Sequence, residues 1–173
     1  MTPKNILSLL QGRDRRKIGQ SNRVVALVTQ DPKLFPQLIA SLWSSDPLVQ
    51  MRAADAAEKV TRVNHPLLVP FKKELLGLMT TATEQEMRWH LAVMIPRLPL
   101  TARERQRVSS LLNKYLDDRS SIVKTFALQG LADLAKNDPN LSAAVVETLR
   151  EATRSGTPAM KARSRRLLLQ LER

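Results

Sequence analysis

The chain has 173 residues, a formal net charge of +12 and no cysteine, which excludes disulfides, thiolate metal sites and cysteine nucleophiles. Its hydrophobic content of 43% is that of a folded protein. No apolar run is long enough to cross a bilayer, and the first ten residues lack the features of a signal peptide. The sequence therefore predicts a cytoplasmic protein without integral membrane association.

The positive charge is concentrated at the two ends of the chain. Residues 1–23 and residues 154–173 each carry a net charge of +5, whereas the segment between them carries only +2. Two interpretations are open. The basic ends are polar caps that keep a repeat protein soluble, or they form an electrostatic surface for an anionic partner.

Helix starts are marked along the chain by an aspartate or threonine directly before a proline, the order of an N-cap followed by the first helical position. These pairs are Thr2-Pro3, Asp31-Pro32, Asp46-Pro47, Asp138-Pro139 and Thr157-Pro158. Two capping boxes, Thr83 to Glu86 and Thr101 to Glu104, mark further starts. Together these signals predict about ten helices, over residues 3–11, 15–29, 32–44, 47–63, 66–80, 84–97, 102–116, 121–136, 139–154 and 158–171.

One helical pattern occurs four times, beginning at the anchor residues Val49, Met87, Val123 and Met160. Apolar residues follow each anchor at fixed offsets and form one stripe at about 100° per residue. The anchors are 38, 36 and 37 residues apart. A period of this length with two helices per unit is typical of an α-solenoid. We expect one domain over 1–173, with a degenerate unit at 1–30 and repeats at 31–64, 65–99, 100–137 and 138–173.

The recurring pattern resembles the second helix of a HEAT repeat, in which an apolar residue precedes a basic one. Arg88, Lys124 and Lys161 match the basic position, and Gln50 departs from it. The family often has an aspartate six residues earlier, which only Asp118 before Lys124 supplies. The resemblance implies an all-α, right-handed α–α superhelix (a HEAT/armadillo-like solenoid) of about ten helices in roughly five antiparallel pairs. It also implies that the second helices line a concave binding face.

Several side chains are expected on that face, opposite the apolar stripe. Trp89 is either exposed for a partner, as binding hot spots often are, or covered by a neighbouring repeat. Trp43 does not belong to this face, because it lies near the end of a first helix, and it is expected in the core. Asp55 with Lys59 and Glu58 with Arg62 have the spacing of ion pairs on one helix. The candidate partner-binding residues are Arg52, Trp89, Val93, Arg97 and Arg166.

The sequence contains no zinc-binding histidine spacing and no glycine-rich phosphate loop, so we expect neither an enzyme nor a cofactor or metal. The first interpretation is a non-catalytic scaffold or adaptor that binds another protein, which can be an acidic one. The alternative is sequence-nonspecific nucleic-acid binding through Arg13, Arg15, Arg16, Lys17, Arg163, Arg165 and Arg166. A third interpretation is a glycosylase like those of DNA-alkylation repair, which are built from HEAT-like repeats, with Asp55, Trp89 and Asp133 on the concave surface.

Overall fold

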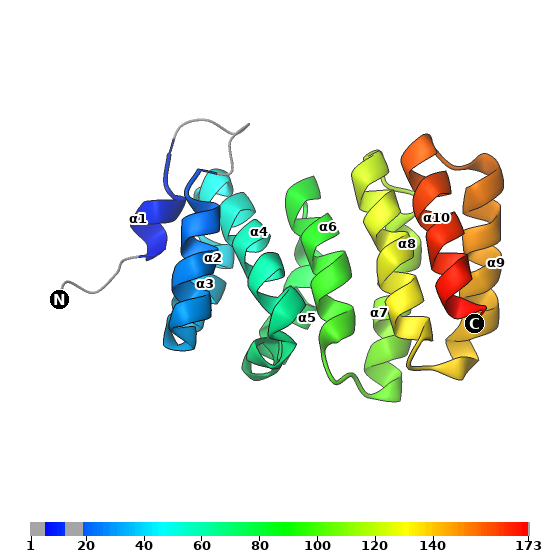
Figure 1. Cartoon of the computed structure of the whole chain (residues 1–173), viewed down its shortest axis with the longest axis horizontal. Coiled ribbons are helices and arrows are strands. Elements are labelled where there is room, and N and C mark those ends of the chain that lie inside the picture. The colour runs from blue at the N-terminus through cyan, green and yellow to red at the C-terminus, as the bar shows by residue number, and fades with distance from the viewer. Residues whose placement is uncertain (1–5, 13–18, 173) are drawn as a thin grey trace. The chain divides into compact units, whose positions relative to one another are not determined.

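The computed structural model describes residues 6–12 and 19–172, and the protein is all-α (Figure 1). The described residues contain ten α-helices and four short 3₁₀ segments, with no strand among them. The all-α class predicted from the sequence is thus confirmed. The chain divides into two compact units, residues 1–72 (unit 1) and 73–173 (unit 2). The single domain expected from the sequence stays a prediction, and each unit is described by itself.

Unit 1 is built around its longest helix, α4 (Pro47–Val63), which begins and ends where the sequence predicts. The Asp46 side chain caps this helix by accepting a hydrogen bond from the backbone N–H of Leu48 at 2.8 Å, and Pro47 occupies the first helical position. Helix α4 packs against α1, α2, α3 and the 3₁₀ segment η2. The remaining elements of the unit are α1 (Ile6–Leu10), α2 (Ser21–Gln30), η1 (Pro32–Leu34), α3 (Phe35–Ala40), η2 (Ser41–Trp43) and η3 (His65–Phe71).

Prolines divide three of the predicted helices. The predicted helix 32–44 is split into η1, α3 and η2. The predicted helix 66–80 begins as the 3₁₀ segment η3, which contains Pro66 and Pro70. The predicted helix 84–97 ends as a 3₁₀ turn at Pro96. Proline has no N–H for the α-helical ladder, so the backbone takes tighter 3₁₀ turns there. Trp43 lies in the 3₁₀ segment η2 and is 47% exposed, so its expected place in the core is wrong. The 3₁₀ turn changes the rotation per residue and thereby the side of the segment on which this ring lies.

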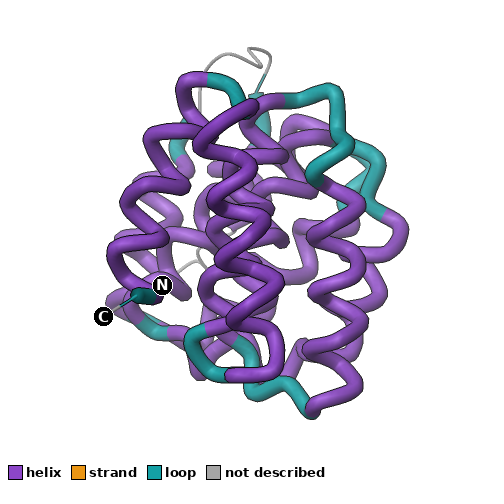
Figure 2. Tube along the Cα trace, turned by 90° about the vertical axis from the view of Figure 1, so that its right-hand side faces the viewer, coloured by secondary structure: helices purple, strands orange, loops and turns teal. Residues whose placement is uncertain are grey.

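Unit 2 has α8 (Ser121–Ala135) at its centre, in contact with α6, α7, α9 and α10. The apolar stripe of α8 is buried at Val123, Ala127, Leu131 and Leu134, as its periodicity predicts. Short links join α7 to α8 and α9 to α10, so these helices form antiparallel pairs (Figure 1). Figure 2 shows the helices in purple and the loops that join them in teal. The other elements are α5 (Lys72–Thr81), α6 (Gln85–Met94), η4 (Ile95–Arg97), α7 (Ala102–Tyr115), α9 (Pro139–Ser155) and α10 (Pro158–Leu171).

Among helices α6 to α10, the helix starts agree with the sequence signals in all but one case. The capping box of Thr101 and Glu104 is present, with reciprocal bonds of 3.2 and 2.7 Å. The capping box expected from Thr83 to Glu86 is not formed, because α6 begins one residue later, at Gln85, with Glu84 as its N-cap. This shift leaves the Thr83 carbonyl as an acceptor for the side chain of Arg88.

Candidate functional site

Three equivalent positions of the repeat lie on the second helices of unit 2. His90, Phe126 and Arg163 each lie three residues after an anchor of the repeating pattern, on α6, α8 and α10 respectively. Because α6 packs on α8 and α8 packs on α10, equivalent positions of these helices become neighbours. The repeat therefore brings the Phe126 ring and the Arg163 guanidinium together, and Trp89, the residue before His90, supplies the second ring against Phe126.

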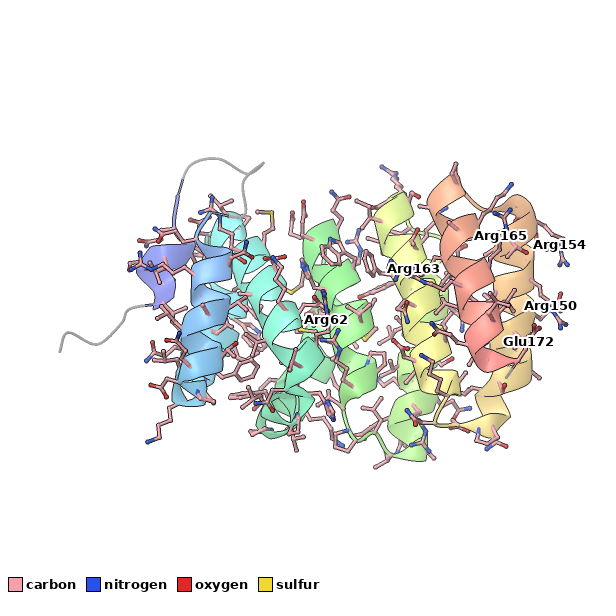
Figure 3. The ribbon with its side chains drawn as sticks, viewed as in Figure 1. Arg62, Arg150, Arg154, Arg163, Arg165 and Glu172 are labelled. Atoms are coloured by element: carbon pink, nitrogen blue, oxygen red, sulfur yellow. The ribbon has the colours of Figure 1, made fainter. Side chains whose placement is uncertain are left out.

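Side chains at and beside these positions form a stacked column. The rings of Trp89 and Phe126 are stacked with centroids 4.8 Å apart and planes 26° apart, and the His90 ring lies against Trp89. The Cζ atom of Arg163 lies 5.0 Å from the Phe126 centroid, in cation–π geometry, so that Arg163 reaches from α10 to α8 (Figure 3). Each such contact is worth about 0.5–1.5 kcal/mol. The column thus joins three helices and fixes the orientation of Arg163.

Arg163 is held by a polar contact as well. Its Nη1 donates to Gln129 Oε1 at 2.9 Å, and the Gln129 amide donates to both Asp133 oxygens at 3.1 Å. Lys136 completes the series with an ion pair to Asp133 at 3.0 Å. Burial lowers the pKa of Arg163 from its ordinary value and the charge of Arg166 lowers it further, whereas Asp133 raises it. The site is therefore a partly desolvated cation with a second cation beside it.

We name this group the second-helix surface of unit 2, and its members lie on α6, α8 and α10. Trp89, Phe126, Gln129 and Arg163 are half-buried, and Arg166 is exposed. For Trp89, the two alternatives predicted from the sequence each apply in part, since a neighbouring repeat covers one face of the ring while part of the side chain stays accessible. The surface consists of Trp89, Phe126, Gln129, Arg163 and Arg166.

Sequence reasoning missed Phe126. Phe126 could have been found from the repeat, because it occupies the same position as Arg52, His90 and Arg163. Gln129 occupies the position of Arg166 one repeat earlier, six residues after the anchor. Comparing equivalent positions between repeats was thus the available signal.

Arg52 is corrected from a partner contact to a structural residue of unit 1. It is only 3% exposed, and its Nη1 donates to the carbonyl oxygens of Leu10 at 2.9 Å and Gln11 at 2.7 Å. Gly19, with a φ of +57°, lies so close that a Cβ there would be 2.7 Å from Arg52 Cζ. The guanidinium is thus enclosed by backbone that follows α1, and a partner has no access to it.

Val93 is corrected in the same way, because it is 6% exposed and belongs to the core of unit 2. Arg97 is half-exposed at the end of η4, beside the helix that carries Trp89. Arg165 is exposed on α10. The remaining predicted nucleic-acid contacts lie outside the described residues, namely Arg13, Arg15, Arg16 and Lys17.

The carboxylates considered for a glycosylase are engaged in ion pairs within their own units. Asp55 pairs with Lys59 at 2.8 Å and accepts a hydrogen bond from Ser21, and Asp133 pairs with Lys136. The predicted pair of Glu58 and Arg62 is also present, at 2.5 Å. This pair raises the pKa of Arg62, first through the hydrogen bond to Glu58.

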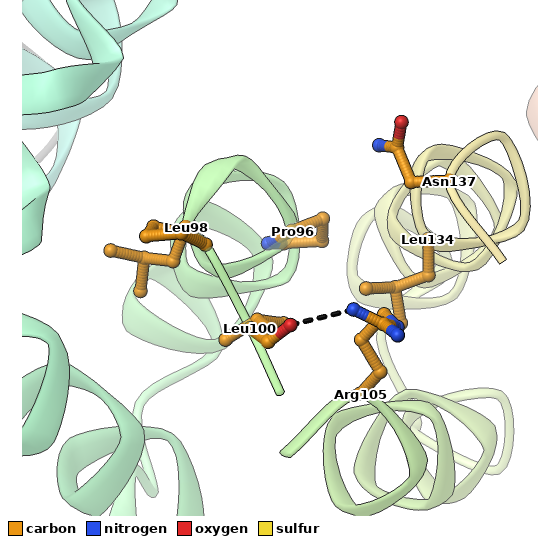
Figure 4. A pocket seen from close by; sticks show the side chains of 7 residues that line it. Pro96, Leu98, Leu100, Arg105, Leu134 and Asn137 are labelled. Carbon is orange, nitrogen blue, oxygen red and sulfur yellow. Dashed lines mark hydrogen bonds between the residues drawn. The ribbon is translucent and has the colours of Figure 1, made fainter. Parts of the chain in front are cut away.

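Two cavities lie beside the second helices of unit 2. A pocket of about 210 Å³ is bounded by the segment 96–100, the start of α7 and the end of α8, and Arg105 in its lining donates to the Leu100 carbonyl at 2.6 Å (Figure 4). A groove of about 690 Å³ lies between the end of α7 and α9, with an apolar floor that includes Leu128 and Met160. Its acidic rim residues Glu147 and Glu151 are paired with Arg154. Asp117 lines the same groove, at the end of α7.

Neither a metal cluster nor a membrane-spanning segment is found in the part of the chain that the structure describes. No group of three or more His, Asp or Glu side chains converges there to hold a metal ion. Among the described helices, none is both long and apolar enough to span a bilayer.

The comparisons with known proteins support the fold and are silent on activity. No protein-family model and no curated protein matches the chain. A matching solved structure is described as the crystal structure of an engineered protein, with a TM-score of 0.63 and 18% sequence identity. The match covers 96% of this chain and 78% of the engineered one. At this level of identity the likeness shows the fold alone.

Proposed function

We propose that this protein is a non-catalytic, HEAT-like binding module, and that the second-helix surface of unit 2 contacts another macromolecule. The observation that carries this proposal is the stacked column of Trp89, Phe126 and Arg163, which leaves two aromatic residues and a guanidinium partly accessible. Tryptophan and arginine are among the side chains that most often dominate the energy of binding interfaces.

The state of these side chains before binding also supports the proposal. Stacking and the bond to Gln129 already restrict Arg163, so a partner would meet an ordered side chain. Ordering a free arginine at an interface costs about 0.5–1.5 kcal/mol, and restriction before binding reduces that cost. A surface built in this way binds more tightly than the same residues would on mobile side chains.

Site-specific photo-crosslinking tests the proposal whatever the identity of the partner. A benzophenone amino acid at Ala162, an exposed position next to Arg163, should give covalent adducts in cells of the native host. The same group at Lys114, an exposed position on α7, serves as the matched control. We expect adducts from position 162 that are absent from position 114 and are reduced by Arg163→Glu. Equal yields at both positions, or none at 162, would contradict the proposal.

A further inference from the structure

One helix of unit 2, α10, carries a concentration of positive charge that no acidic residue of its own compensates. Helix α10 contains no aspartate or glutamate, yet it carries Lys161, Arg163, Arg165 and Arg166 within six residues. Within the described part of the chain, Arg166 makes no hydrogen bond or ion pair with any protein group. The nearby Asp133 is already shared between Gln129 and Lys136.

Arg163 and Arg166 face in similar directions and affect each other. At about 100° per residue they lie about 60° apart around the helix. Their proximity is expressed in the pKa of Arg163, which Arg166 lowers. Two guanidinium groups in this arrangement repel each other, and an anion bound between them would remove the repulsion and accept several charge-assisted hydrogen bonds.

We propose that Arg163 and Arg166 bind the phosphodiester backbone of a nucleic acid. This inference names the class of partner for the binding function proposed above, and it rests on that function. Lys161 and Arg165 lie on another side of α10, and Lys124 occupies the position of Lys161 in α8. A single carboxylate on a protein would neutralise one of the two guanidinium groups, whereas successive phosphates of a continuous polyanion meet both Arg163 and Arg166.

The aromatic column indicates how the nucleic acid is recognised. Phe126 lies between Trp89 and Arg163, so both of its faces are already covered, and no base inserts into the column without breaking it. The column positions Arg163 for the backbone, and direct reading of base edges plays no part. Binding is therefore independent of sequence and strongly dependent on salt.

Fluorescence anisotropy tests the binding of the full chain to nucleic acid at about 50 and about 200 mM salt. The labelled ligands are an oligothymidine, a DNA duplex and a polyglutamate. We expect the double variant Arg163→Ala with Arg166→Ala to lose about tenfold or more in nucleic-acid affinity and to lower the salt slope by about 1.4 for the single strand. The control replaces Arg150 and Arg154 by alanine, which removes equal charge from α9, where both residues are ion-paired (Figure 3). This control should stay within about twofold of the wild type.

Three results would overturn the proposal where the chain does bind nucleic acid. They are an unchanged affinity of the double variant, an equal loss in the control, and polyglutamate binding as tight as nucleic-acid binding with the same dependence on the arginines. Because Arg163 also packs on Phe126, Arg166→Ala alone is measured too, and it should lose affinity while keeping the wild-type unfolding temperature. Absence of nucleic-acid binding together with protein adducts from position 162 would reject this inference and leave the proposed binding function standing.

Discussion

Arg88 Nε lies 2.8 Å from Asp118 Oδ2, which joins α6 to the turn that precedes α8. The same guanidinium also donates to the carbonyl of Thr83, five residues earlier. Arg105 repeats this arrangement, with 2.9 Å to Asp138 and 2.6 Å to the carbonyl of Leu100, again five residues earlier. In both cases one arginine links the start of its own helix to the start of a later one. We refer to the two pairs as arginine clamps, and they fix the relative positions of helices within unit 2.

The first prediction concerns the energy of the clamp between Arg88 and Asp118. Both side chains are largely buried, so we expect a coupling free energy of about 1–2 kcal/mol from a double-mutant cycle of Arg88→Met and Asp118→Asn. Urea unfolding followed by circular dichroism gives the free energies. The exposed pair of Glu147 and Arg150, 3.8 Å apart, is the control and should couple by less than about 0.5 kcal/mol. Equal coupling in the two cycles would mean that the clamp has no special role.

The clamps also define what the sequence could not predict. Helix starts follow from local capping residues, and for this reason α4 and α10 begin where expected. Asp118, by contrast, has the spacing to Lys124 that the family resemblance suggests, while its partner in the structure is Arg88, 30 residues earlier. Pairing across that distance depends on how the helices pack, and a local pattern carries no information about it.

The second prediction compares two glycines of unit 2 that have opposite surroundings. A Cβ on Gly130 would lie 2.2 Å from the carbonyl oxygen of Ala92, where α8 approaches α6 closely. A Cβ on Gly77 in α5 would meet nothing within 4 Å. Gly77→Ala should therefore raise the free energy of unfolding by about 0.5–1 kcal/mol, through helix propensity alone.

Gly130→Ala should lower the free energy of unfolding by about 1–3 kcal/mol despite the same gain in propensity, because the added methyl group forces α6 and α8 apart. Thermal and urea unfolding of both variants measure the difference. Equal free energies of unfolding for Gly130→Ala and Gly77→Ala would contradict the close approach of α6 and α8 at this glycine.

The third prediction is the titration of Tyr115, the one tyrosine in the sequence. Its hydroxyl donates to the Met79 carbonyl at 3.0 Å, and burial raises the pKa of the Tyr115 phenol to about 12, with Arg88 opposing and Asp118 adding to the shift. Ultraviolet absorbance of the phenolate should therefore show a midpoint near 12 in the folded protein and near 10 in urea.

The sign of the effect on stability follows from that shift. Because the folded state holds the phenolic proton more tightly, Tyr115 stabilises the fold fully below about pH 10, and this contribution is lost as the pH rises toward 12. Tyr115→Phe should abolish the titration and weaken the alkaline loss of stability. A midpoint near 10 in the folded protein would show that the ring is solvated.

The fourth prediction is the pH dependence of the second clamp. The hydrogen bond from Arg105 is the main cause that lowers the pKa of Asp138, and the backbone N–H of Asn140 lowers it further. A carboxylate with a depressed pKa stabilises the folded state above its unfolded value of about 3.9 and loses that contribution as the pH falls below it. The stability difference between the wild type and Asp138→Asn should thus be constant near neutral pH and shrink below about pH 4. A difference independent of pH would exclude an ionised Asp138.

The sequence alone predicts only part of the candidate surface. Trp89 stood out because it lies away from the apolar stripe, and Arg166 because α10 is so basic. Arg52 looked equally accessible, since an arginine within a helix is usually solvated. Its burial results from the backbone after α1 folding over it. Long-range contacts of this kind decide which of several similar arginines is structural and which is open to a partner.

The fifth prediction tests that assignment for Arg52. Arg52→Met removes the donor to the Leu10 and Gln11 carbonyls, and leaving buried acceptors without their partner costs about 1–3 kcal/mol. The loss is measured by urea unfolding followed through Trp43 fluorescence, in a Trp89→Phe background so that the signal reports unit 1. Arg23→Met, at an exposed position on α2, is the matched control and should change stability by less than about 0.5 kcal/mol. Equal stability of the two variants would return Arg52 to the set of residues open to a partner.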